Sequence, residues 1–344
     1  MNESAAPLLE VRGLKKHFTI SRGLLTGNPQ VVHAVDGVDL VVRRGETLAL
    51  VGESGCGKST LGRSILGLTP VTSGEILLQG KRIDNLSQSA MREMRQRIQI
   101  VFQDPFSSLN PRMRVRDIIG EPLRNFKLVK GRAGLNKRVA ELLELVHLPS
   151  DILERFPHEF SGGQRQRLGI ARALATNPDL IVFDEAVSAL DVSVKAQILN
   201  LLTELQARLG LAMLFISHDL AVVEHIADLV VVMYLGKVAE IGPRRSIFAQ
   251  PTHPYTRALL SAVPIPDPKI RRERILLGGD TSSPINPAPG CRFRTRCPYA
   301  FDRCQREDPA LLIQPTGQSV ACHLSAEGRM PPARPLAAEA IRVE

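Results

Sequence analysis

The 344-residue chain contains no tryptophan, only 4% aromatic residues and no long apolar run. Its longest apolar stretches are far shorter than the roughly 18 residues that a membrane-spanning helix needs, so we expect any membrane contact to be peripheral. The first ten residues lack a basic segment followed by an apolar one, which argues against a secretory signal and favours a reducing cytosol. Hydrophobic residues make up 44% of the chain and charged residues 23%, which excludes a disordered or collagen-like protein and predicts a soluble globular one.

Cysteine and proline are concentrated near the C-terminus. Four of the five Cys and twelve of the 24 Pro lie in residues 264–344, which predicts two differently built parts. We place the boundary after residue 263, because the prolines at 264, 266 and 268 cannot continue a helix or a sheet. The net charge of +9 suits a protein that binds nucleic acid, an anionic membrane surface or phosphate groups, and charge alone does not choose among them.

Residues 1–263 alternate apolar, β-branched runs with helix-like segments, which is the pattern of an α/β domain. Several runs are continuously apolar, as in strands that are buried on both faces of a mostly parallel sheet. The segment 104–177 has no convincing strand and predicts an inserted helical subdomain. We expect strands at 31–42, 47–51, 98–102, 180–183, 212–216 and 229–233, and helices at 58–68, 137–146, 163–175, 194–209 and 221–227.

A phosphate-binding loop follows the second of these strands. Residues 52–60 read GESGCGKST, which fits G-x-x-x-x-G-K-[ST] and opens a helix, as the motif requires. The glycines let backbone N–H groups surround phosphate oxygens, while Lys58 is expected to reach the outer phosphates and Ser59 to bind Mg²⁺. Cys56 is expected to be a small side chain that the loop tolerates and not a nucleophile, since phosphoryl transfer to water needs no thiol. The nucleotide contacts predicted in this loop are Gly52, Ser54, Gly55, Gly57, Lys58, Ser59 and Thr60.

Two carboxylates end the apolar run LIVFDE at 180–185. We expect Asp184 to hold Mg²⁺ and Glu185 to polarise an attacking water. Two acids at the end of a strand can also be no more than solvent-exposed residues at the edge of a sheet. A phosphate-binding loop in the same chain makes the functional interpretation stronger. Together the two motifs predict a P-loop NTPase, a class that includes kinases, GTPases and helicases.

The segment FSGGQRQR at 160–167 narrows the class, because it resembles the signature of the ATP-binding-cassette (ABC) ATPases. The resemblance implies that Ser161, Gly162, Gly163 and Gln164 bind the γ-phosphate of an ATP that is held by the opposite subunit. The chemistry agrees, since free N–H groups at a helix N-terminus stabilise an anion. A simple helix cap at Ser161 is the structural alternative, and it leaves the two glycines unexplained.

Other positions match the family one by one. Gln103 resembles the glutamine that contacts Mg²⁺ and the attacking water, and Asp191 lies in an SALD segment that resembles an interface loop. His218 resembles the histidine that contacts the γ-phosphate, and Phe18 is the candidate for an aromatic ring that stacks on adenine. Ala186 stands where many family members have proline, a difference from which we expect little effect.

The resemblance therefore implies an active ATPase rather than a degenerate half-site. The implied catalytic residues are Glu185, His218 and Gln103, and the implied Mg²⁺ ligands are Ser59, Gln103 and Asp184.

Four further segments, VFQDPFSSLNP, FPHEF, ALDVSV and HPYT, resemble the ATP-binding subunits of bacterial dipeptide and oligopeptide importers. The LKKH segment and the tail at 284–304 most resemble the second, F-type, ATPase subunit of such systems. This implies a non-identical ATPase partner, two membrane permease subunits and, indirectly, an extracytoplasmic peptide-binding protein, with the chain at the cytoplasmic face of the inner membrane. Import of nickel, glutathione or a haem precursor is an alternative. A nucleic-acid role is disfavoured, because the chain has a single cassette and no sustained heptads.

Cys291, Cys297, Cys304 and Cys322 form the last candidate site. Their spacing lacks the C-x-x-C pair of most zinc ribbons, and a cytosolic location argues against disulfides. Four thiolates suit either Zn²⁺ or a 4Fe–4S cluster, and we favour the iron–sulfur cluster, with free or disulfide-linked thiols left as another possibility. His323 is expected to be a bystander. The hypothesis is that the metal centre fastens the tail and helps it to pack against the partner ATPase.

Overall fold

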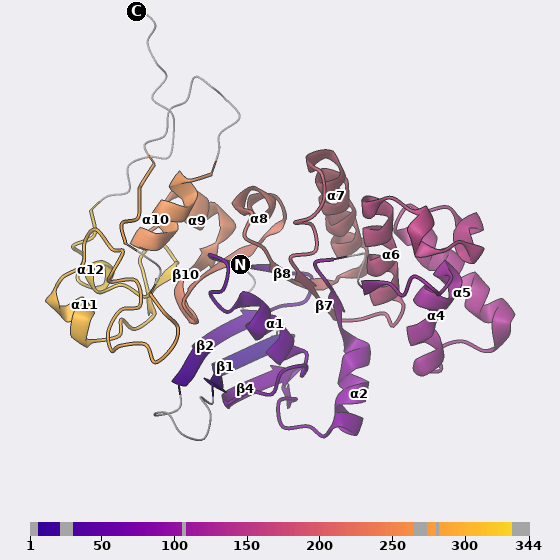
Figure 1. Cartoon of the computed structure of the whole chain (residues 1–344), viewed down its shortest axis with the longest axis horizontal. Helices are drawn as coiled ribbons and strands as arrows, with labels where there is room; N and C mark the ends of the chain where they lie inside the picture. Colours follow the sequence, from indigo (N-terminus) through magenta and orange to yellow (C-terminus); the bar gives the residue numbers. More distant parts are fainter. Residues whose placement is uncertain (1–5, 21–29, 105–107, 264–273, 280–281, 332–344) are drawn as a thin grey trace, which may run out of the picture.

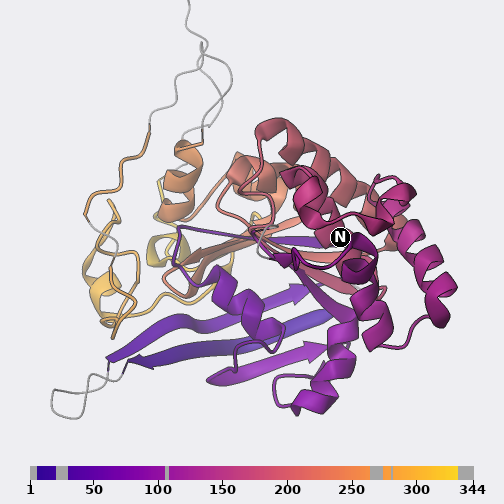
Figure 2. The same cartoon turned by 45° about the vertical axis from the view of Figure 1, so that its right-hand side comes forward.

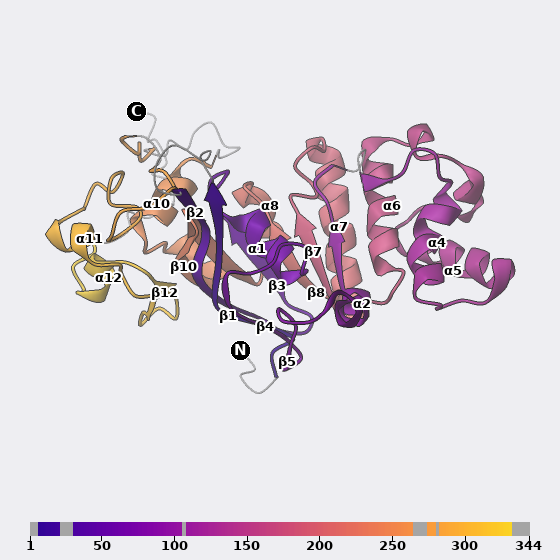
Figure 3. The same cartoon turned by 60° about the horizontal axis from the view of Figure 1, so that its bottom comes forward.

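The computed structural model describes residues 6–20, 30–104, 108–263, 274–279 and 282–331. The predicted linker at 264–268 lies outside these residues. In Figures 1 and 3 a helical part and the C-terminal part lie at opposite ends of the molecule, with the sheets between them. None of the described helices is long and apolar enough to cross a membrane.

The core is an eight-stranded sheet with the order β11-β12-β10-β9-β3-β8-β7-β6, in which β11 is Leu312–Ile313 and β12 is Ser319–Val320. The five strands from β9 to β6 are parallel. Every residue of β3, β7 and β8 is buried, as the continuous apolar runs predict. This confirms the expected mostly parallel core. The bounds are β3 Thr47–Val51, β6 Ile98–Val101, β7 Leu180–Asp184, β8 Ala212–Ile216, β9 Leu229–Tyr234 and β10 Lys237–Pro243.

Alternate residues of the parallel strands point to opposite faces of the sheet and enter different cores. Leu180 and Val182 join a cluster with helices α1 and α2, whereas Ile181 and Phe183 pack with α6 and α7. The helices that cover the sheet are α1 Lys58–Ile65, α2 Gln88–Arg97, α6 Gly162–Leu174, α7 Val192–Leu209, α8 Leu220–Ile226, α9 Arg244–Ala249 and α10 Pro254–Ser261. Helix α1 is three residues shorter than predicted, and the left-handed Gly67 (φ 63°) follows it.

A second, antiparallel sheet has the order β2-β1-β4-β5. Figure 2 shows its long strands side by side beneath α1. Strand β1 was not predicted, because register shifts at three places along its pairing with β2 break the alternation of apolar residues that identifies a strand. The bounds are β1 Leu9–Ile20, β2 Gln30–Val42, β4 Ser73–Leu78 and β5 Lys81–Arg82.

The inserted segment is helical, and its described residues between β6 and β7 contain no strand. Helix α5 begins six residues earlier than expected. The buried faces of α4, α5 and α6 pack together in one core cluster. The bounds are α4 Val115–Asn125, α5 Gly131–Leu145, η1 Ser150–Glu154 and η2 Pro157–Glu159.

The C-terminal region extends the main sheet instead of forming a separate core. Glu240 of β10 pairs with Val320 of β12, and β12 pairs in turn with β11. The ring of Phe293 lies 5.2 Å from that of Tyr234 and 5.4 Å from that of Tyr255, inside a cluster that includes β3 and β9. The bounds are α11 Asp302–Arg306, β11 Leu312–Ile313, β12 Ser319–Val320 and α12 His323–Ala326.

Candidate nucleotide and cysteine sites

The carboxyl ends of four neighbouring parallel strands meet at one edge of the main sheet. In the strand register Ile216 of β8 faces both Leu50 of β3 and Asp184 of β7, and Phe183 of β7 faces Val101 of β6. The loops that follow these strands therefore share this edge, where parallel sheets bind ligands. They carry the phosphate-binding loop, Asp184, Glu185, His218 and Gln103.

The phosphate-binding loop is tight, and two positions accept only glycine. Gly52 (φ 148°) and Gly57 (φ 106°) have backbone angles that other residues rarely adopt. A Cβ atom at Gly57 would lie 2.0 Å from the carbonyl oxygen of Ala34, and one at Gly52 would lie 2.2 Å from that of Met233. Ser54 and Gly55 are exposed at the tip of the loop, where a ligand can reach them.

Lys58 is buried and lies against its own loop. Its Nζ donates hydrogen bonds to the carbonyl oxygens of Gly52 and Glu53, each at 2.9 Å. These contacts hold the ammonium group where the outer phosphates of a nucleotide would meet it. Burial raises the pKa of the neighbouring Cys56, whose thiol is thus neutral at pH 7 and suits the passive role expected for it.

Ser59 and Asp184 come together as predicted. The Ser59 hydroxyl donates to Asp184 Oδ1 at 2.7 Å, and the guanidinium of Arg63 lies 3.8 Å from the other oxygen of the carboxylate. A hydroxyl and a carboxylate beside a phosphate-binding loop are the oxygen ligands that Mg²⁺ prefers. The arrangement fits a Mg²⁺ site.

Glu185 and His218, two of the residues predicted to be catalytic, lie side by side. His218 Nδ1 lies 3.3 Å from Glu185 Oε2. Glu185 has a left-handed backbone (φ 52°). Two hydrogen bonds support this conformation: the Glu185 N–H donates to Ile216 O at 3.0 Å, and the Glu185 carbonyl accepts from the Ser188 hydroxyl at 2.9 Å. Such strain is often stored at functional sites. Gln103 is exposed just after β6, at the same edge.

The signature segment opens helix α6. Ser161 and Gln164 form a reciprocal capping box, with N–H to side-chain oxygen distances of 3.0 and 3.4 Å. The helix cap that the sequence offered as an alternative is therefore present. Figures 1 and 3 place α7 between α6, which the segment opens, and α1, which follows the phosphate-binding loop. The two halves of the predicted ATP site are thus separate within one chain.

Two further predicted residues are accessible. Asp191 is exposed at the start of α7 and its side chain caps no N–H group, while the adjacent Val192 is 83% exposed. Phe18 on β1 is 42% exposed, and Lys16 Nζ lies 4.6 Å from the centre of its ring. An exposed aromatic ring can stack on a base.

The four C-terminal cysteines line one small cavity, together with His253, Phe293 and His323. All four are free thiols rather than disulfides. Burial raises the pKa of Cys291 to about 12 and that of Cys297 to about 11, so without a metal these thiols are protonated at pH 7. The Nε2 of His323 lies 2.9 Å from the carbonyl oxygen of Glu307, so this ring nitrogen contacts the backbone and not the thiols.

Sequence reasoning missed two residues that contact the phosphate-binding loop from far along the chain. The hydroxyl of Tyr255 accepts a hydrogen bond from Glu53 N at 2.9 Å, and Arg296 donates to the Glu53 carboxylate. Tyr255 lies in the HPYT segment and Arg296 in the tail at 284–304, but nothing in either segment's sequence points to the phosphate-binding loop. Only the acidic Glu53 within an anion-binding loop could have signalled that a cation was required there.

Comparison with known proteins agrees with this geometry. The family model described as "ABC transporter" matches residues 35–188, and the one described as "Oligopeptide/dipeptide transporter, C-terminal region" matches residues 239–304. The second match starts within β10, well before the boundary predicted after residue 263, and that boundary stays a prediction.

Curated relatives match over nearly the whole chain. A probable peptide ABC transporter ATP-binding protein, y4tS of Sinorhizobium fredii, is 53% identical over 93% of this chain and 90% of its own length. The oligopeptide transport ATP-binding protein AppF of Bacillus subtilis is 51% identical over 92% of this chain and 97% of its own length.

Two solved structures have the same fold. The cbiO1 protein of Clostridium perfringens, part of the ABC transporter complex cbiONQ, has a TM-score of 0.60 and 29% identity over 70% of this chain and 90% of its own. The ATP-binding cassette MJ0796, solved as a dimer with bound ADP and Pi, has a TM-score of 0.59 and 28% identity over 69% of this chain and 99% of its own.

Proposed function

Because this chain belongs to the family of ABC transporter ATP-binding proteins, we propose that it hydrolyses ATP to power the import of di- and oligopeptides across the cytoplasmic membrane. The observation that carries the proposal is the whole-length similarity to peptide transport ATP-binding proteins, joined to a phosphate-binding loop with its predicted Mg²⁺ ligands and catalytic residues beside it. Lys58, Ser59, Asp184, Glu185 and His218 meet at the same sheet edge.

Each predicted residue of the nucleotide site has a role. Lys58 and the loop N–H groups bind the phosphates, and Phe18 stacks on the base. Ser59, Asp184 and Gln103 would hold Mg²⁺, which would neutralise phosphate charge. Glu185 accepts a proton from the attacking water, and His218 orients the Glu185 carboxylate and meets the γ-phosphate.

The second half of each ATP site comes from another chain. Ser161–Gln164 lie apart from the phosphate-binding loop of their own chain. Asp191 and Val192, at the start of α7, are exposed. The partner we propose is a related, non-identical ATPase, with both chains beneath two permease subunits at the cytoplasmic face and a peptide-binding protein on the opposite side of the membrane. Closure of the ATPase pair on ATP switches the permease between outward and inward access.

The function is tested with the complete transporter in membrane vesicles. We expect peptide-loaded binding protein to stimulate ATP hydrolysis several-fold, and RNA or DNA to have no effect. Vesicles without the permease subunits serve as the control. Stimulation only by a non-peptide solute such as nickel or glutathione would contradict peptide import, and stimulation only by nucleic acid would contradict transport altogether.

We further propose that the four cysteines hold a 4Fe–4S cluster. Among the described residues, the only trio of His, Cys, Asp or Glu ligand atoms that all lie within 4.8 Å of one another is His17, His33 and Asp36, so no three of the cysteine sulfurs are that close. A single Zn²⁺ with four Zn–S bonds of about 2.3 Å requires sulfurs closer together than this. A cluster separates its thiolates more widely, which supports iron–sulfur over zinc. Its role would be to fasten the tail.

Anaerobic reconstitution of the purified chain with iron and sulfide tests the cluster. We expect a broad absorbance near about 400 nm and bound iron, both lost in Cys291→Ser. The matched control is Cys56→Ser, which changes a buried cysteine outside the cavity. A preparation that binds Zn²⁺ but no iron would contradict the cluster, and one that binds neither metal would contradict any metal centre.

A further inference from the structure

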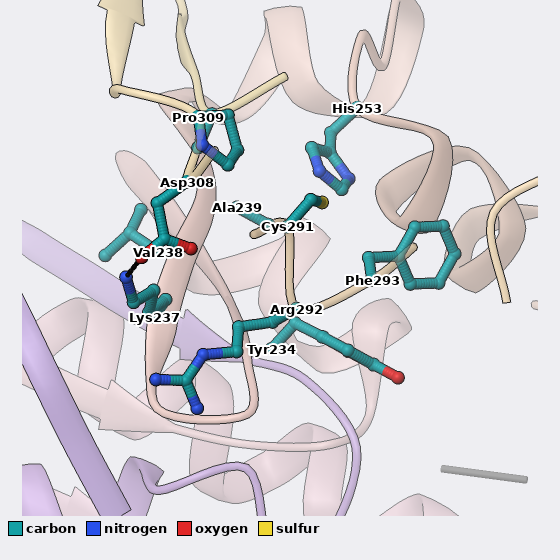
Figure 4. Close-up of a pocket in the computed structure, with 11 residues that line it drawn as sticks. Tyr234, Lys237, Val238, Ala239, His253, Cys291, Arg292, Phe293, Asp308 and Pro309 are labelled. Carbon is teal, nitrogen blue, oxygen red and sulfur yellow. Dashed lines mark hydrogen bonds and ion pairs between the residues drawn. The ribbon is translucent and has the colours of Figure 1, made fainter. Parts of the chain in front are cut away.

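The segment between the first two cavity cysteines reaches the nucleotide site. Arg296 Nη1 donates to both carboxylate oxygens of Glu53, at 3.0 and 2.8 Å, although the two residues are 243 positions apart. Arg292 Nη2 donates to Asp36 Oδ2 at 2.5 Å. In Figure 4 the Cys291 thiol and the Arg292 guanidinium point in opposite directions. The same short segment therefore lines the cysteine cavity and contacts the ATP-binding part of the chain.

Glu53 is the second residue of the phosphate-binding loop, and its main chain is fully used. Its N–H donates to the Tyr255 hydroxyl, and its carbonyl accepts from Lys58 Nζ, both at 2.9 Å. Of the polar groups of Glu53, only the side-chain carboxylate is left to pair with another residue. A negative charge in a loop that binds a triphosphate repels the ligand unless a cation neutralises it.

Arg296 is well placed to supply that cation. Its side chain is 12% exposed and that of Glu53 is 30% exposed, so water screens the pair less than it screens a surface ion pair. The neighbouring Phe293 anchors the segment between Tyr234 and Tyr255. The Cys291 N–H donates to Cys304 O at 2.9 Å, which ties the segment to the cysteine cavity.

Arg292 anchors the other end of the segment to β2. Asp36 also contacts His17 Nε2 at 3.1 Å and His33 Nδ1 at 3.4 Å. Burial alone would raise the pKa of Asp36, but the hydrogen bonds from the two histidines lower it, and the Arg292 charge lowers it further. This carboxylate already has a cation beside it, so the trio does not call for a metal ion.

We propose that Arg296 is a positioning residue of the nucleotide site, which neutralises Glu53 and keeps the phosphate-binding loop receptive to ATP while the cysteine-lined cavity holds Arg296 in place. The proposal rests on the proposed role of residues 52–60 in ATP binding. It makes the C-terminal region part of the nucleotide site.

The test is the dissociation constant of a fluorescent ATP analogue for the purified full chain. Arg296→Ala is expected to raise it roughly five- to tenfold, because the loop then carries an uncompensated charge. Adding Glu53→Gln removes that charge and is expected to restore the constant to within about twofold. Raising the salt concentration should shrink the defect of the single variant.

Arg303→Ala is the matched control, because it breaks exposed ion pairs with Glu307 and Glu327 in the same region and should leave the constant unchanged. An unchanged constant in Arg296→Ala would overturn the proposal, and so would a defect that Glu53→Gln fails to restore, since that is the mark of a purely structural role. Lys58→Ala tests the ATP-binding role of residues 52–60 separately from the role of Arg296. Unimpaired ATP binding by this variant would overturn the nucleotide site itself.

Discussion

Replacing Glu185 by glutamine is expected to slow ATP hydrolysis by the assembled transporter at least ~100-fold without weakening ATP binding, because general-base catalysis typically contributes that much. Glutamine keeps the size of the side chain and its hydrogen-bonding reach to His218, which lies 3.3 Å away in the native chain. It cannot accept a proton from water at neutral pH. Phosphate release measures the turnover, and a fluorescent ATP analogue measures the binding.

The chain contains a matched control for this variant. Glu204 also pairs with a histidine, His147, at 3.2 Å, but the pair is exposed on the surface. Glu204→Gln should therefore leave both turnover and binding unchanged. Full turnover in Glu185→Gln would show that Glu185 is not the base. Loss of ATP binding in this variant would show that the Glu185 carboxylate contributes to nucleotide binding and not only to catalysis.

Most of the nucleotide site follows from local sequence. A buried strand predicts where its loop begins, and parallel neighbours place their loops at one edge, so the approach of Ser59 to Asp184 is predictable from the two motifs alone. The strained backbone of Glu185 is not, because it depends on a hydrogen bond to Ile216 on the next strand. Local patterns show which residues react, whereas their strain depends on tertiary neighbours.

Long-range contacts explain what else the sequence left open. Strand β1 escaped prediction because its register shifts against β2 disturb the period of two. The composition shows that four cysteines lie in the tail, and these predict a metal centre that fastens it. In addition, Phe293 fills the core beneath β9, and Val320 extends the sheet at β10. Partners that lie tens of residues apart along the chain leave no periodic signal in either segment.

The second large effect is expected from Gly162→Asp in the signature segment. The variant should bind its own ATP normally, yet turnover by the assembled transporter should fall ~100-fold or more, the scale of losing a preorganised anion site. The new carboxylate would occupy the N–H groups at the start of α6 and repel the γ-phosphate of the partner's ATP. Turnover of the complex and ATP binding by the separate chain are the two measurements.

Gly162 is the position where this effect can be separated from misfolding. Within the described part of the chain, a Cβ atom there would meet only Leu190 Cδ2, at 3.7 Å, whereas one at Gly163 would lie 2.4 Å from Val194 Cγ1. An acidic residue in the first turn also interacts favourably with the helix dipole, so the variant should fold at least as well as the native chain. Gly162→Asn has the same shape without the charge and should lose much less activity. Native turnover in Gly162→Asp would show that this segment does not face a nucleotide, and loss of its own ATP binding would place the segment in the site of its own chain.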